Sequence, residues 1–183
     1  MDLKDKLQRA SEVFDILEQT LPLNLKGQFV KVQKDPHGFP DAKPIYGKLR
    51  IMPDNKNVPK TFWHQKWCFY VVGVGRIGAD YKRFPLNIAC DAHVMFQMPH
   101  GDKGCGKGQH EEAVEDVLTS AKNSLGTDWE FCSVPKKDGP KHFLVKPYLP
   151  AGNYPRDGHL PTASVLAQDL AALINATYPA FLK

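Results

Sequence analysis

Apolar positions along the chain recur with two periods, and each period predicts a different element. Between residues 2 and 21 they recur at steps of three and four, which predicts an amphipathic helix. The same spacing returns over residues 111–125, where Gly126 follows as a C-terminal cap. It returns again in a last helix, which Thr162 caps and Pro179 closes. The sequence therefore predicts an N-terminal, a middle and a C-terminal helix.

A strict alternation of apolar and polar residues predicts strands between these helices. The clearest run is residues 86–96, where apolar side chains share one face and Asp91 and His93 share the other, as in a half-buried strand. Residues 66–75 are apolar on both faces, which is typical of a central strand. Further strands are predicted at residues 27–33, 45–51, 129–134 and 142–146.

Strands joined by short turns favour an antiparallel sheet with the helices packed on one face. We therefore predict one α+β domain over residues 1–183, with a mainly antiparallel sheet of about five to seven strands and three packing helices. In its order of elements the chain resembles small accessory domains found with bacterial restriction and defence nucleases. The resemblance implies an accessory domain related to bacterial or phage defence.

Composition and charge narrow the class of protein. The chain is 42% hydrophobic and 24% charged, within the ordinary globular range. It holds no apolar run on the order of 18 residues and begins without an apolar signal segment, so we expect a cytoplasmic protein with no membrane partner. In that compartment the four cysteines are expected to be free thiols.

Basic residues are concentrated between residues 43 and 67. Six lysines and arginines against a single aspartate give this segment +5, whereas the whole chain carries +4. Aromatic residues are interleaved with them, and this mixture suits nucleic acid because cations contact phosphates while aromatic rings stack on bases. Alternatively, the lysines only guard a strand against edge pairing. The predicted basic-aromatic surface, within residues 43–83, comprises Tyr46, Lys48, Arg50, Lys60, Trp63, His64, Lys66, Arg76, Lys82 and Arg83.

A glycine-rich segment between the 86–96 strand and the middle helix holds further chemistry. Four glycines from Gly101 to Gly108 predict a loop with much backbone freedom. Residues 101–107 match the phosphate-binding pattern G-x-x-x-x-G-K, but Gly108 stands where a magnesium-binding hydroxyl is needed and four acidic residues soon follow. Whether this loop binds an anion is left open by the sequence.

The same region contains side chains that could hold a metal or act as a nucleophile. Nitrogen and sulfur ligands suit zinc, although their spacing here follows no established zinc pattern. Cys105 lies between glycines and near lysines, which could lower its pKa and activate it beside a histidine. The candidate metal ligands are Asp91, His93, His100, Cys105 and His110.

Taken together, these patterns favour a non-enzymatic binding module that engages nucleic acid, DNA or RNA, through the basic-aromatic surface. No cofactor is expected, zinc being the metal that the 91–110 region would suit. One alternative is a protein-interaction factor, such as an inhibitor or an immunity-type protein. A second is a metal- or cysteine-dependent enzyme centred on residues 91–110. The sequence leaves the identity of the partner and the oligomeric state open.

Overall fold

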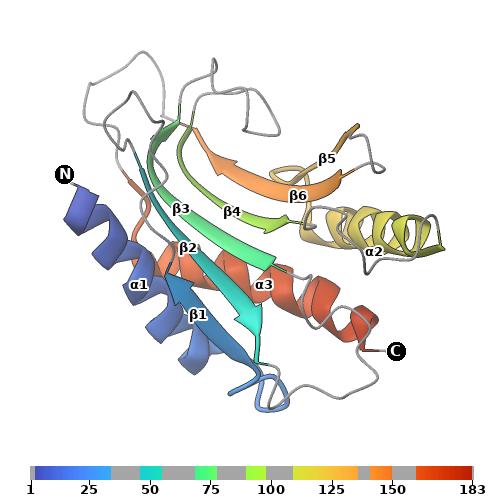
Figure 1. Cartoon of the computed structure of the whole chain (residues 1–183), viewed down its shortest axis with the longest axis horizontal. Helices are drawn as coiled ribbons and strands as arrows, with labels where there is room; N and C mark the ends of the chain where they lie inside the picture. Colours follow the sequence, from blue (N-terminus) through green and yellow to red (C-terminus); the bar gives the residue numbers. More distant parts are fainter. Residues whose placement is uncertain are drawn as a thin grey trace.

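The structure is a computed structural model that describes residues 3–33, 46–54, 69–77, 90–97, 109–135, 141–149 and 160–182. Within these ranges three helices and one antiparallel sheet of six strands form a single α+β arrangement (Figure 1), so the predicted fold class is confirmed. In chain order the elements are α1 (Leu3–Thr20), β1 (Phe29–Gln33), β2 (Tyr46–Pro53), β3 (Phe69–Ile77), β4 (Cys90–Gln97), α2 (Gln109–Leu125), β5 (Glu130–Val134), β6 (Lys141–Tyr148) and α3 (Ala163–Phe181).

The described strands lie in the order β1-β2-β3-β4-β6-β5, and every neighbouring pair is antiparallel. Among the described strands, every neighbouring pair except β4–β6 joins strands that follow one another in the chain, as the predicted antiparallel sheet requires. β3 lies inside the sheet between β2 and β4, which confirms that residues 66–75 contain a central strand.

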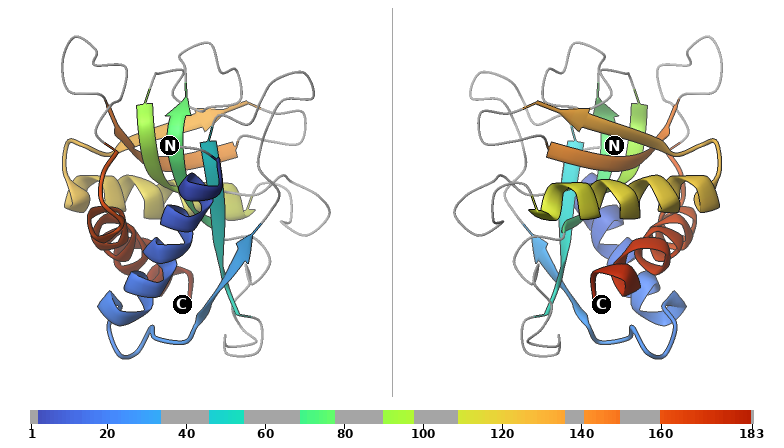
Figure 2. Two further views of the ribbon diagram at one scale, coloured as in Figure 1. Left: turned by 90° about the vertical axis from the view of Figure 1, so that its left-hand side faces the viewer. Right: turned by 90° about the vertical axis from the view of Figure 1, so that its right-hand side faces the viewer.

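One face of the sheet, here called the inner face, carries the main core. Alternate side chains such as Val72, Val94 and Leu144 point from it toward the helices and are fully buried. α1 and α3 pack against each other and against the middle of the sheet, while α2 packs against α3 and the β6–β5 end (Figure 2). All three helices therefore contribute to one continuous apolar cluster on this face, as the sequence predicts.

The helix ends follow their sequence signals except at the last one. Thr162 caps α3 by accepting a hydrogen bond from the Val165 backbone N–H, and Gly126 after α2 adopts a positive φ of 101°. The prediction that Pro179 closes α3 is wrong, because the helix continues to Phe181. Phe181 is buried and stacks on Phe96 at 5.5 Å between ring centroids, which holds the last turn against the sheet. None of the described helices is long and apolar enough to cross a membrane.

The opposite face, here called the far face, carries the strand side chains that point away from the helices. Val71, Met95, Phe143 and Val145 form a second, smaller buried cluster with Cys90. The expectation of a half-buried β4 is wrong, because both faces of this strand are buried from Cys90 to Phe96. Because both faces of β4 are buried, its polar residues Asp91 and His93 lie inside the protein, on the far face.

Candidate functional site

The far face brings together residues from both predicted functional sets. Lys48 and Arg50 of β2 alternate with Leu49 and Ile51, which are buried on the inner face, so the two basic side chains belong to the far face. In the antiparallel register Lys48 pairs with Gly73, and Gly73 pairs with His93 of β4. A basic residue and a candidate metal ligand therefore share one row across three strands.

Gly73 leaves room for the His93 ring between β2 and β4, because glycine has no side chain. A Cβ atom placed on Gly73 would lie 2.2 Å from Cε1 and 2.7 Å from Nδ1 of His93, far inside van der Waals contact. The imidazole therefore lies directly over the backbone of β3, in the space that any other side chain at this position would fill. A glycine inside a strand commonly marks such a close approach.

Burial decides the charge of His93. Its side chain is only 2% exposed, and burial, with the positive charge of Lys48 as a smaller cause, lowers its pKa from 6.5 to about 3. The ring is therefore neutral at physiological pH. A base of such low pKa accepts a proton poorly near neutrality, so this position is unsuited to general base catalysis.

Asp91 lies on the same strand two residues before His93 and is only 7% exposed. Its Oδ2 finds no hydrogen-bond donor among the residues that the structure describes. Buried polar atoms without a partner are uncommon, and they often mark a place where water or a ligand belongs. Asp91 is therefore a polar group of the far face whose hydrogen bonding is incomplete among the described residues.

The described residues do not assemble the predicted metal set. Asp91 and His93 come together on β4, but His110 belongs to α2, which packs on the inner side of the sheet. His100 and Cys105 lie outside the described residues. Within the described ranges no group of three or more histidine, cysteine, aspartate or glutamate side chains could hold a metal ion.

The structure describes only some residues of the predicted basic-aromatic surface. Besides Lys48 and Arg50, the structure places Tyr46 at the start of β2, paired with Gly75, and Arg76 near the end of β3. The other members lie outside the described residues, as does the glycine-rich segment 101–108: they are Lys60, Trp63, His64, Lys66, Lys82 and Arg83. The part that can be assessed is therefore the β2 strand and its neighbours.

Lys31 of β1, in contrast, faces inward and serves the fold. The Lys31 ammonium donates to the Ser11 hydroxyl at 2.8 Å, lies 3.6 Å from the Asp15 carboxylate, and sits over the Phe14 ring. These contacts join β1 to α1. A basic side chain on a strand is thus not by itself a sign of a binding surface, and the face to which it belongs decides its role.

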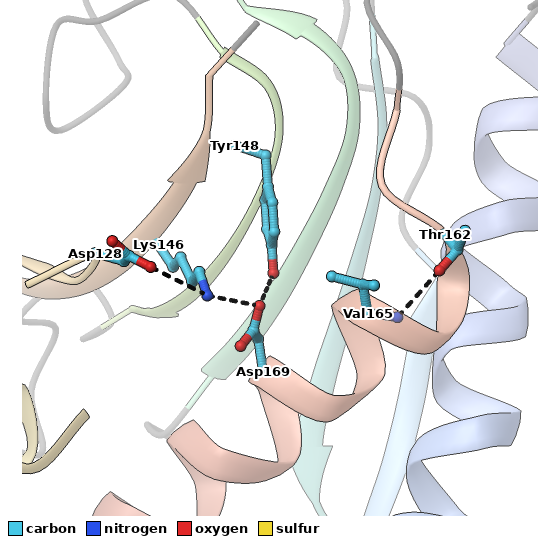
Figure 3. A network of polar contacts seen from close by, with 6 residues as sticks. All are labelled: Asp128, Lys146, Tyr148, Thr162, Val165 and Asp169. Atoms are coloured by element: carbon cyan, nitrogen blue, oxygen red, sulfur yellow. Dashed lines mark hydrogen bonds and ion pairs between the residues drawn. The ribbon is translucent and has the colours of Figure 1, made fainter. Parts of the chain in front are cut away.

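The inner face also holds a polar network that the sequence did not predict. Figure 3 shows Lys146 and Tyr148 of β6 converging on Asp169 of α3. The Tyr148 hydroxyl donates to Asp169, the Lys146 ammonium lies 3.0 Å from the same carboxylate oxygen, and a longer contact of 3.8 Å joins it to Asp128. Burial, followed by the bond to Asp169, raises the Tyr148 pKa, so the phenol stays protonated. The network ties α3 to β6.

His142 of β6 is a second buried histidine, on the inner face. It is 1% exposed and stacks on Phe131 of β5, with ring centroids 5.7 Å apart and planes 26° apart. Neither ring nitrogen has a hydrogen-bond partner among the described residues. Its position within an alternating strand was visible in the sequence, but no spacing signal distinguishes such a histidine from one on a solvated face.

The two described cysteines are free thiols, as expected. Burial first, and a neighbouring carboxylate second, raises the pKa of Cys90 and of Cys132 to about 12. Because the thiolate is the nucleophile, neither side chain is suited to covalent catalysis at neutral pH. The thiol of the cysteine hypothesis, Cys105, lies outside the described residues.

Searches of protein-family models, of curated proteins and of solved structures found no match to this chain.

Proposed function

We propose that the protein binds nucleic acid through the far face of its sheet, along β2. The observation that carries this proposal is the pair Lys48 and Arg50, which stand two residues apart on one side of a strand. Side chains at this spacing stand roughly 7 Å apart along the strand, close to the separation of successive phosphates on one nucleic-acid strand.

The location of this pair supports the proposal further. The three described helices pack on the inner face, so Lys48 and Arg50 lie on the side of the sheet away from them. Both side chains are partly exposed. Their segment is also the most basic part of a mildly basic chain, which favours an anionic partner.

The test is a comparison of two double variants that remove the same charge. Affinity for labelled single- and double-stranded DNA and RNA is measured at about 50 mM and about 200 mM salt. For Lys48→Ala/Arg50→Ala we expect weaker binding and a salt dependence whose slope falls by roughly 1.4 to 1.8. The control, Lys4→Ala/Lys26→Ala, changes exposed lysines on α1 and in the turn before β1 and should keep the wild-type slope.

Equal losses in the two double variants would mean that net charge, and not the far face, determines binding. Absence of binding by the wild-type chain to every probe would overturn the proposal itself. In that case the protein-interaction alternative becomes the working hypothesis.

That alternative rests on a weaker observation. The most exposed large apolar side chain among the described residues is Leu23, at 86%, in the turn after α1. The others are Val30, Leu149 and Val165, on three further segments. Singly exposed apolar residues are ordinary on soluble proteins, whereas a docking surface normally gathers them into a patch.

A further inference from the structure

The row formed by Lys48, Gly73 and His93 has an unusual geometry. Neighbouring strands are about 4.8 Å apart, so residues on β2 and β4 are separated by about 10 Å. In most sheets the side chain on the strand between would fill this space. Here Gly73 has no side chain and the imidazole of His93 lies over it, so the ring spans from β4 toward β2.

The electrostatics of the row agree with this placement. Burial first, and the charge of Lys48 second, lower the pKa of His93, which is consistent with the place of the two residues in one row. A protonated ring here would repel the lysine. A neutral ring instead offers a flat surface against which the aliphatic stem of a lysine can pack while its charged end reaches water.

We propose that His93 is a positioning residue for Lys48: its ring, seated over Gly73, supports the lysine stem and holds the ammonium in place for a phosphate. The inference rests on the proposed function, since it names how one of the two binding cations is held. Arg50 provides an internal comparison, because its row continues through Val71 and Met95 and does not include His93.

Double-mutant cycles test the proposal. We expect His93→Ala to weaken nucleic-acid binding by about threefold or more, and Lys48→Ala to add little in that background because the lysine is already poorly placed. In the cycle of His93→Ala with Arg50→Ala the losses should multiply. His93→Phe, which keeps a flat ring over Gly73, should restore binding to within about twofold of wild type.

A general loss of stability would weaken binding in both cycles alike, so unequal coupling separates positioning from a merely structural role. Losses that multiply equally in the two cycles, or full affinity in His93→Ala, would overturn the proposal. Failure of His93→Phe to restore binding would also contradict it, since a flat ring would then be insufficient.

A second measurement does not depend on nucleic acid. The order parameter of the Lys48 side-chain Cε is measured by carbon-13 relaxation in wild type, His93→Ala and His93→Phe, with the exposed Lys26 as reference. We expect it to fall toward the Lys26 value only in His93→Ala. An unchanged value would overturn the positioning role even if the chain binds nucleic acid. A fall in a chain that binds no nucleic acid would leave the positioning intact and remove the proposed function.

Discussion

On β3, Val72 points toward the three helices and Val71 points to the opposite side, yet both side chains are fully buried. Val72 belongs to a cluster that draws on every helix and most strands. Val71 belongs to a cluster with few buried members among the described residues, on a face that also carries Lys48 and His93. Neighbouring residues of one strand thus belong to two different environments. The inner face is packed against the helices, whereas the far face also carries basic and polar side chains.

Polar groups differ between the two faces as well. On the inner face the Tyr70 and Thr177 hydroxyls lie 2.8 Å apart, and Thr177 also donates to a backbone carbonyl of α3. Asp169 accepts from Tyr148 and pairs with a lysine. On the far face Asp91 Oδ2 has no such partner among the described residues. His142 is an exception on the inner face, because neither of its ring nitrogens has a partner among the described residues. Apart from it, we infer that the inner face is optimised for stability and that the far face retains groups suited to binding.

The largest expected effect concerns the inner-face network. Asp169→Ala removes the acceptor of Tyr148 and leaves Lys146, among the described residues, with only the more distant carboxylate of Asp128. We therefore expect the free energy of unfolding to fall by about 3 kcal/mol. Asp128→Ala is the matched control. Its side chain is 76% exposed, so its loss should be below about 0.5 kcal/mol. Equal effects of the two changes in urea denaturation would refute the assigned role of Asp169.

A matched pair on β3 tests the difference in packing. We expect Val72→Ala to lower the free energy of unfolding by about 2 to 3 kcal/mol, because the cavity forms inside the large core. Val71→Ala, one residue away and equally buried, should cost only about 1 kcal/mol, since the described part of its apolar cluster is smaller. Denaturation curves of the two variants give the two losses in free energy of unfolding. A larger loss for Val71→Ala than for Val72→Ala would contradict the expected difference in packing between the two faces.

The far face should also make stability depend on pH through His93. Burial lowers its folded pKa to about 3, so as pH falls below about 6.5 the unfolded chain takes up a proton that the folded chain refuses. Stability is therefore full above about pH 6.5 and declines toward about pH 3, with a loss of about 2 kcal/mol already at about pH 5.

The variant His93→Phe removes this titrating group while keeping a ring over Gly73. Its stability should change less between about pH 7 and about pH 5, a range that lies above the pKa values of most carboxylates. The same decline in wild type and variant would assign the pH dependence to other groups.

The smallest expected effect concerns the exception on the inner face, His142. Replacing it by phenylalanine removes two ring nitrogens that lack partners among the described residues and keeps the stacking on Phe131. We expect the free energy of unfolding to rise by about 1 kcal/mol. A loss of stability in thermal or chemical unfolding would instead show that the imidazole makes a polar contact that the phenyl ring cannot replace.

Most of the fold could be predicted from the sequence because its signals are local. The three helices, the alternation of Leu49 and Ile51 with Lys48 and Arg50, and the cap at Thr162 each depend on residues within a few positions of one another. Pro179 was misread because the burial of Phe181, a tertiary contact, extends the helix past a residue that usually ends one.

The candidate site could be predicted only in part, since it depends on register between distant segments. The sequence indicated Lys48 and His93 separately, in two different hypotheses, and nothing local revealed that Gly73 brings them into one row. Asp169 and Tyr148 were missed for the same reason, because a strand and a helix meet there only after folding. The expected exposure of His93 was wrong because alternation alone does not report what covers a face.

The central claim, that nucleic acid binds on the far face along β2, is tested most directly by methyl-group NMR. By alternation Val30 and Met52, which pair across β1 and β2, lie on the far face, whereas Val13 and Leu170 lie in the inner core. On addition of a single-stranded oligonucleotide we expect the Val30 and Met52 signals to shift and the Val13 and Leu170 signals to stay. Shifts confined to α3 surface positions such as Val165, or no shifts at all, would contradict the claim.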